Sequence, residues 1–129
     1  MSVRKPVVAV VDDDPRVLES LADLLESEGY DARTYSSASV LLEAGLSGVD
    51  AIISDIGMPG IDGFEFRNLI SKALPELPIF LITGRHELAE QGRAQGISGL
   101  FRKPFDGQAL LAAVADALSG KKGEGDEQC

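Results

Sequence analysis

Short apolar runs recur along the chain and predict strands. The clearest cover residues 7–11, 51–53 and 79–82, and all three are rich in Val, Ile or Leu. None alternates between apolar and polar positions, which is typical of strands buried on both faces, as in a parallel sheet. Weaker signals predict two further strands, over residues 31–35 and 99–102.

Helical periodicity separates the predicted strands. The strongest stripe, at i, i+1, i+4, i+7 and i+8, consists of Val17, Leu18, Leu21, Leu24 and Leu25. Asp14 and Pro15 precede it as an N-cap followed by a proline at the first helical position. Gly29 follows it at the place of a C′ glycine. A last helix, with its apolar stripe over residues 110–118, is predicted to end near Gly120.

Five strands that alternate with five helices predict an α/β fold built from right-handed βαβ crossovers. The solution we expect for one domain of this size is flavodoxin-like: a doubly wound (βα)5 unit. Its five parallel strands lie in the order 2-1-3-4-5, with helices on both faces. We assign this domain to residues 1–120. Residues 121–129 are polar and contain two glycines, and they predict a disordered tail.

Charge and composition narrow the function. The 129 residues carry a net charge of -9, so this domain gains nothing from phosphate neutralisation and direct binding of nucleic acid is not expected. No apolar run approaches the ~20 residues that span a bilayer, and no signal peptide is recognisable at the start. The single cysteine, Cys129, cannot form an internal disulfide. We therefore expect a cytoplasmic protein that makes no membrane contact.

Polar residues follow four of the predicted strands. Asp12 and Asp13 follow the first, Asp55 the third, Thr83 the fourth and Lys103 the fifth. In the order 2-1-3-4-5 the first and third strands are neighbours, so the three aspartates converge at the carboxyl edge of the sheet. Clustered carboxylates recruit a cation, and a set of oxygen ligands suits Mg²⁺.

Each of these residues has an ordinary explanation when taken alone. Aspartates are common in strand-to-helix loops, and Lys103 alone could be a surface lysine whose stem covers apolar surface. The functional interpretation rests on one fold bringing all of them to the same end of the same sheet. Asp14 is interpreted as a helix cap outside the site.

Four segments together resemble the signature of response regulator receiver domains. They are Val-Val-Asp-Asp-Asp (10–14), Ser-Asp-Ile-Gly-Met-Pro-Gly-Ile-Asp-Gly (54–63), Ile-Thr-Gly (82–84) and Lys-Pro-Phe (103–105). The resemblance covers about residues 6–119. It implies that Asp55 is the phospho-acceptor. It also implies that Asp13 and Asp55 bind Mg²⁺ directly, together with the carbonyl of Gly57, while Asp12 acts through water.

The same resemblance implies roles for three further residues. Thr83 would donate a hydrogen bond to the phosphoryl group, and Lys103 would pair with it. A cis peptide before Pro104 would aim Lys103 inward.

The function that follows is a signalling switch rather than an enzyme with a separate substrate. A sensor histidine kinase or a histidine phosphotransfer protein would supply the phosphoryl group. The switched surface, formed by the fourth helix, fifth strand and fifth helix, would bind a downstream protein or a second copy of the chain. A stand-alone receiver is favoured over one followed by an output domain.

One position departs from the family pattern. Receivers commonly carry an aromatic switch residue three positions before the lysine, where this chain has Leu100. Phe101 is adjacent, but neighbouring residues on a strand face opposite sides. The output surface therefore signals in a way that the usual aromatic swing does not describe.

Three other functions compete with this interpretation. A haloacid-dehalogenase-type phosphatase would need Thr or Val where Arg16 stands. A flavodoxin-type FMN carrier would place its phosphate against three aspartates that repel it. A degenerate receiver, used for binding alone, is disfavoured by the intact Asp55, Thr83 and Lys103.

Overall fold

The carboxyl ends of five parallel strands form one edge of a single sheet, and this edge carries the residues of interest. The computed structural model describes residues 5–57, 63–96, 99–103 and 106–126, with side chains as far as residue 119. Within them the strand order is β2-β1-β3-β4-β5, and every neighbouring pair is parallel. The predicted order and direction are therefore confirmed.

Strands and helices alternate throughout. The strands are β1 (Val7–Val11), β2 (Asp31–Tyr35), β3 (Ala51–Asp55), β4 (Ile79–Thr83) and β5 (Leu100–Arg102). The helices are α1 (Pro15–Ser27), α2 (Ala38–Ala44), α3 (Gly63–Ala73), α4 (His86–Ala94) and α5 (Gly107–Asp126). None of these helices, within the described residues, is long and apolar enough to cross a membrane.

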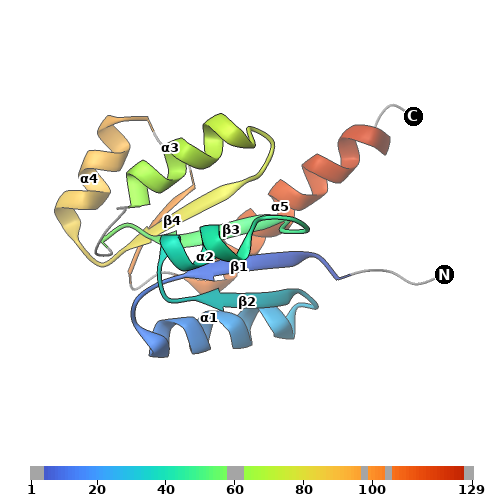
Figure 1. Cartoon of the computed structure of the whole chain (residues 1–129), viewed down its shortest axis with the longest axis horizontal. Coiled ribbons are helices and arrows are strands. Elements are labelled where there is room, and N and C mark those ends of the chain that lie inside the picture. The colour runs from blue at the N-terminus through green and yellow to red at the C-terminus, as the bar shows by residue number, and fades with distance from the viewer. Residues whose placement is uncertain (1–4, 58–62, 97–98, 104–105, 127–129) are drawn as a thin grey trace.

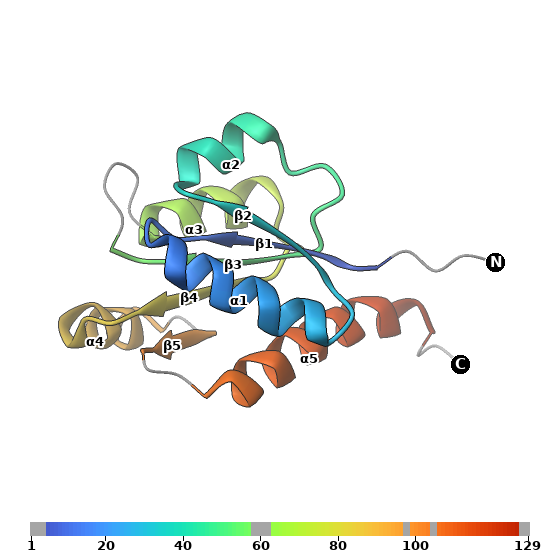
Figure 2. The same ribbon diagram turned by 90° about the horizontal axis from the view of Figure 1, so that it is seen from below.

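Helices cover both faces of the sheet (Figures 1 and 2). On one face, α1 and α5 pack against alternate residues of the central strands, among them Val8, Val10 and Ile53. On the other face, α2 and α3 pack against the intervening residues, such as Ala9 and Ile52. All residues of β1 and β3 are buried, which explains their unbroken apolar sequence.

Besides the apolar clusters on the two faces of the sheet, a smaller cluster fixes the position of α4. It joins Leu88 of this helix to Leu81 of β4, Leu100 of β5 and Phe64 of α3, and to Ile56, which follows β3. The half-buried Ile79 packs against this cluster and also against the cluster beneath α2 and α3. The helix α4 therefore lies on the same face of the sheet as α3. The polar strand ends are thus bordered by α1 and α5 on one side and by α3 and α4 on the other.

The ends of α1 follow the signals read from the sequence. Asp14 caps it, because the Asp14 carboxylate accepts the Arg16 N–H at 3.0 Å. At the other end Gly29 has a φ of 88°. Its N–H donates to the Glu26 carbonyl at 3.1 Å, and the Tyr30 N–H donates to the Leu25 carbonyl at 3.2 Å. These two bonds form a Schellman motif, which explains why a glycine ends the helix.

The last helix is longer than the sequence predicts. Its expected end was near Gly120, followed by a disordered tail over residues 121–129, yet α5 continues to Asp126. Once a helix is nucleated, each further residue adds a backbone hydrogen bond without needing an apolar side chain, which is the signal that the prediction relied on. Residues 127–129 lie outside the described part of the chain.

Gly63 is the point where the chain returns to β3 after the loop that follows Asp55. Its N–H donates to the Ile56 carbonyl at 2.9 Å. A Cβ at this position would lie 2.5 Å from the Ile56 Cα and 2.9 Å from the Asp55 carbonyl oxygen. Both neighbours are backbone atoms that cannot swing away, so the sequence must have glycine here.

We expect Gly63→Ala to lower the free energy of unfolding by about 3 kcal/mol, the upper part of the overpacking range. Gly92→Ala on α4 is the matched control. Its added Cβ would meet side chains instead of backbone, the flexible tip of Leu100 at 2.7 Å and the edge of the Phe64 ring at 3.3 Å. Alanine also favours the helix by up to about 1 kcal/mol, so we expect a smaller loss than for Gly63→Ala. Urea unfolding measures both, and equal losses would show that the Gly63 backbone contact is not limiting.

Candidate functional site

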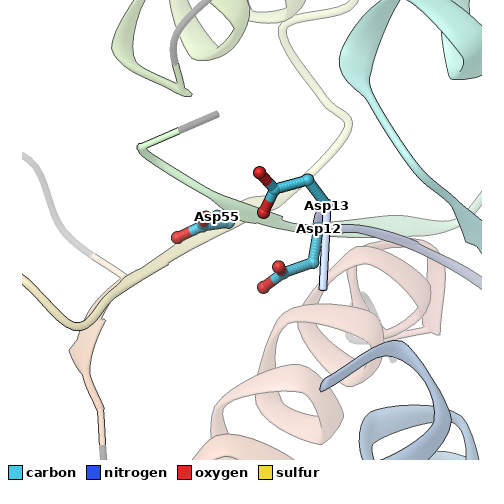
Figure 3. Close-up of side chains that lie close together, drawn as sticks. All are labelled: Asp12, Asp13 and Asp55. Carbon is cyan, nitrogen blue, oxygen red and sulfur yellow. The ribbon is translucent and has the colours of Figure 1, made fainter. Parts of the chain in front are cut away.

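Three carboxylates converge beyond the ends of β1 and β3. The register pairs Val11 of β1 with Ser54 of β3, so the next residues, Asp12 and Asp55, leave the sheet side by side. Asp12, Asp13 and Asp55 each offer one ligand atom, and these atoms all lie within 4.8 Å of one another. Figure 3 shows the three side chains pointing to the same side of the strand ends. The predicted convergence is confirmed.

Asp12 is the most enclosed of the three, with 1% of its surface exposed. One carboxylate oxygen accepts the Asp14 N–H at 2.9 Å, and the other accepts from Lys103 Nζ at 3.2 Å. A buried carboxylate needs such partners, because removing its charge from water costs several kcal/mol, which the hydrogen bonds and the ion pair offset. Asp13, in contrast, is exposed at the mouth of the cluster.

Lys103 follows β5, the strand at one edge of the sheet, and its side chain extends to the aspartates that follow β1 and β3. Its backbone N–H donates to the Thr83 carbonyl at 2.7 Å, which continues the pairing of β5 with β4. Its Nζ lies 3.2 Å from Asp12 Oδ2 and 3.9 Å from Asp55 Oδ1. The lysine side chain is 27% exposed, so its positive charge is held partly out of water between two carboxylates.

The surroundings of Asp55 disfavour its charged form. Burial raises the pKa of the Asp55 carboxyl, and the negative charge of Asp12 raises it further. The Lys103 charge and a hydrogen bond from the Gly57 N–H lower that pKa in part, and Asp13 adds a small increase. The net direction is upward, so one lysine does not compensate for the acidic cluster.

Asp12, Asp13, Asp55 and Lys103 together form what we call the aspartate pocket. Its charge balance indicates which ligand it can hold. Three carboxylates and one lysine leave a net charge of -2 when all are ionised, since three negative charges face one positive charge. A divalent cation would neutralise that excess. Carboxylate oxygens are hard ligands that suit Mg²⁺, which keeps several waters when few protein ligands are present. The residues therefore fit a magnesium ion.

Thr83 and Gly57 are close to Asp55 in the fold: Thr83 follows Ile82, the β4 partner of Asp55, and the Gly57 N–H donates to the Asp55 carboxylate. Thr83 ends β4 with 1% of its surface exposed, and its Oγ1 accepts the Arg85 N–H at 3.0 Å. Gly57 follows β3, and a Cβ added there would lie 3.9 Å from both Cδ and Nη1 of Arg85. The Arg85 side chain thus passes over Gly57, at the side of the pocket that faces α4.

Leu100, the atypical switch position, lies away from the aspartates. Leu100 packs with Leu88 of α4 and Phe64 of α3 rather than against the aspartates. Phe101 faces the other side of the sheet, where its ring lies 6.5 Å from that of Phe80, as the strand alternation predicts. Pro104 lies outside the described residues.

The sequence interpretation missed one contact of the site. Ser54 is fully buried, and its hydroxyl donates to the carbonyl of Asp55 at 3.0 Å. The signal was a hydroxyl residue at the end of an otherwise apolar run, at residues 51–54. A polar side chain inside a two-sided buried strand needs a partner, and that requirement could have drawn attention to it.

Comparison with known proteins identifies the family. The model of the response regulator receiver domain matches residues 8–115. The chain belongs to the response regulator receiver domain family. The sequence resemblance is therefore confirmed, and the family match favours a receiver over a dehalogenase-type phosphatase or an FMN carrier.

Relatives and a solved structure agree with this assignment. The chain is 35% identical over 125 residues to the transcriptional regulatory protein FixJ of Azorhizobium caulinodans, covering 94% of this chain and 59% of FixJ. It is 34% identical over 121 residues to the response regulator protein TodT of Pseudomonas putida, covering 92% of this chain and 53% of TodT. This receiver thus spans little more than half the length of these relatives.

The solved structure is that of the signal receiver domain of an HD domain-containing protein from Pseudomonas fluorescens. Its TM-score is 0.82 at 28% identity, with 98% of this chain and 96% of that chain covered. The receiver fold is thus shared over almost the whole length of both chains. Receivers of this family generally bind Mg²⁺ at an acidic pocket, which is the kind of pocket that Asp12, Asp13 and Asp55 form here.

We expect Asp55→Asn to stabilise the metal-free receiver at pH 7, by about 1 kcal/mol, the usual size of a single-residue effect. A carboxyl whose folded pKa is raised binds its proton more tightly when folded. Stability is therefore lost as pH rises from the ordinary pKa of 3.8 through the raised value. The asparagine is neutral throughout, so its advantage should shrink as pH falls toward 3.8. Urea unfolding in EDTA at several pH values measures the gap, and a gap independent of pH would contradict the burial argument.

Proposed function

We propose that this receiver accepts a phosphoryl group on Asp55 from a phosphohistidine, with Mg²⁺ bound in the aspartate pocket. The donor would be a sensor histidine kinase or a histidine phosphotransfer protein. The observation that carries the proposal is the pocket itself: three carboxylate ligand atoms within 4.8 Å of one another, bordered by Lys103. In the proposed step an Asp55 oxygen forms the new O–P bond while the P–N bond breaks. The histidine ring of the donor, protonated on its other nitrogen beforehand, takes the electrons of the P–N bond and leaves as neutral imidazole.

Asp55 is the best nucleophile of the three aspartates. Both oxygens of Asp12 are already engaged, one by the Asp14 N–H and one by Lys103. Asp13 is exposed and lies on the loop after β1. Asp55 stands at the end of β3, and the Lys103 ammonium is 3.9 Å from its carboxylate, so an oxygen can approach phosphorus without first breaking a short ion pair with this lysine.

The metal would be held by the groups that remain. We propose Asp13, Asp55 and the Gly57 carbonyl as direct ligands, with Asp12 acting through a bound water because Lys103 holds one of its oxygens. When bound, Mg²⁺ supplies positive charge beside the oxygens of the transferring group. Phosphoryl transfer is catalysed mainly by such electrostatic stabilisation and by positioning.

Lys103 and Thr83 complete the proposed pocket. The Lys103 ammonium lies between Asp12 and Asp55, where it can pair with a phosphoryl oxygen after small movements. Thr83 Oγ1 accepts a hydrogen bond from the Arg85 N–H, so the hydroxyl proton is available for donation. Turning that proton to the phosphoryl group would disturb the start of α4, and this is the proposed origin of the switch.

A surface groove lies beside the pocket. It measures about 590 Å³ and runs along α1 to the start of α5, with Val17, Leu21 and Leu24 on its apolar part and Lys103 at one end. Because Lys103 borders both the groove and the aspartates, a protein that presents phosphohistidine to Asp55 would pass over it. We propose the groove as part of the donor-binding surface.

The output side of the domain is proposed to be the surface of α4, β5 and α5, which would bind a downstream protein or a second receiver. This chain spans 59% of FixJ and 53% of TodT, so a longer regulator and a stand-alone receiver are both compatible with the proposal. The role is that of a cytoplasmic switch that catalyses its own phosphorylation and dephosphorylation, not of an enzyme with a separate product.

Incubation with acetyl phosphate or phosphoramidate and Mg²⁺ should add one phosphoryl group to the intact protein. Asp55→Asn and an EDTA control should both remove the adduct, because the first deletes the acceptor and the second the cation. Intact mass spectrometry measures each sample. A wild-type chain that stays unmodified with small donors and with phosphohistidine donors would favour a degenerate receiver used for binding alone.

Magnesium should stabilise the folded receiver by about 1.4 kcal/mol at tenfold its Kd. Asp13→Asn should lose most of this gain, because it removes a proposed direct ligand. Asp14→Asn is the matched control, since it removes a neighbouring charge while asparagine still caps α1. Thermal unfolding with and without Mg²⁺ compares the three chains. Equal losses in the two variants would mean that the ion responds to general acidity rather than to a defined site.

A further inference from the structure

We propose that Ser54 is a positioning residue for the reaction at Asp55, a role that rests on the proposed phosphorylation of Asp55. Its hydroxyl donates to the Asp55 carbonyl oxygen at 3.0 Å and is fully buried. Ser54 touches no reacting atom. It acts by holding the backbone from which the Asp55 side chain extends.

The Asp55 carbonyl lies just beyond the end of the pairing between β1 and β3. Pairing between β1 and β3 runs from Val8 with Ala51 to Val11 with Ser54. Asp55 is one residue beyond that last pair. On its other side β4 still holds the peptide between Asp55 and Ile56, because the Ile56 N–H donates to the Ile82 carbonyl at 2.9 Å. A buried carbonyl at a strand end needs a donor from outside the ladder, and the Ser54 hydroxyl is a donor in hydrogen-bonding range.

A second contact holds the same peptide from the other side. The Gly63 backbone approaches so closely that an added Cβ would lie 2.9 Å from the Asp55 carbonyl oxygen, and its N–H donates to the Ile56 carbonyl. The peptide between Asp55 and Ile56 is therefore held in three ways: β4 accepts its N–H, the Ser54 hydroxyl donates to its carbonyl, and the start of α3 packs closely against it. Of the two hydrogen bonds, only the one to the carbonyl comes from a side chain.

The orientation of that peptide matters for two atoms of the site. It sets the direction of the Asp55 side chain, and it sets the path to Gly57, whose N–H donates to the Asp55 carboxylate. Both ends of the Gly57–Asp55 hydrogen bond thus depend on the peptide that Ser54 holds. Phosphoryl transfer relies on positioning, and a displacement of about 1 Å can cost a factor of about 100 in rate.

Packing alone does not require serine at this position. The residues before it, 51–53, are apolar and fully buried, and an alanine would fill nearly the same volume as serine. What an alanine lacks is the donor to the Asp55 carbonyl. The hydroxyl is therefore the feature to which we assign the positioning role.

Three variants test the assignment: Ser54→Ala, Ser54→Thr and Ile52→Val. The first removes the hydroxyl, and the second restores it on a side chain that favours strands. The third, two residues earlier on the same face of β3, removes a buried methylene without touching the Asp55 carbonyl. Labelling by acetyl phosphate at saturating Mg²⁺ gives the rate, and NMR of the metal-free protein gives the amide proton shift of Gly57.

We expect Ser54→Ala to slow labelling about tenfold at saturating Mg²⁺ and to move the Gly57 amide shift toward that of a solvent-exposed amide. Ser54→Thr should recover most of the rate, and Ile52→Val should lose stability while keeping the wild-type rate and shift. A rate loss in Ile52→Val equal to that in Ser54→Ala would reduce the serine to a general stabilising residue and overturn the assignment.

The outcomes also separate this inference from the function it rests on. If wild type labels and Ser54→Ala labels equally fast with an unchanged Gly57 shift, the inference fails while the proposed function stands. If wild type does not label, the proposed function fails, and an unchanged Gly57 shift in Ser54→Ala then disproves the positioning role as well. Should Ser54→Thr not fold, Ser54→Ala and Ile52→Val still decide.

Discussion

A single lysine held between two carboxylates is the interaction on which the site depends. Asp12 is almost fully enclosed and would be costly to ionise without a partner, and Lys103 Nζ supplies one at 3.2 Å. The two residues are 91 positions apart in the sequence. They meet because β1, β3, β4 and β5 end at the same edge of one parallel sheet. Strand order and site therefore support each other.

The carboxylates at this edge of the sheet also lower the stability of the fold. Asp55 is driven toward its neutral form by burial and by the charge of Asp12, and the lysine offsets this only in part. Tight backbone contacts counteract the repulsion by leaving the chain little freedom to move the aspartates apart. Gly63 against Ile56 and the Ser54 hydroxyl on the Asp55 carbonyl are two of them. A charged pocket on a rigid frame is what a cation-dependent reaction requires.

In the proposed switch, a change at this pocket passes to the rest of the domain through α4. The helix is fastened near its start by the bond from the Arg85 N–H to Thr83 Oγ1. Farther along, Gly92 allows α4 to lie directly against Leu100 and Phe64, since a Cβ there would come within 3.3 Å of both side chains. Leu100 thus fills space between β5 and α4 instead of standing where an aromatic ring could swing. A change at Thr83 would reach the surface through the seating of α4 on this leucine.

The sequence by itself determined the elements and their order. Unbroken apolar runs gave buried parallel strands, and Asp14, Pro15 and Gly29 set both ends of α1, because caps and burial periodicity are local properties. Convergence of Asp12, Asp13 and Asp55 followed from strand order alone. Only the tertiary structure decided which aspartate Lys103 holds, what Ser54 binds and why Gly63 must be glycine. These contacts depend on how segments approach one another to within about 3 Å in the folded chain. The pattern of apolar and polar residues along the sequence does not contain that information.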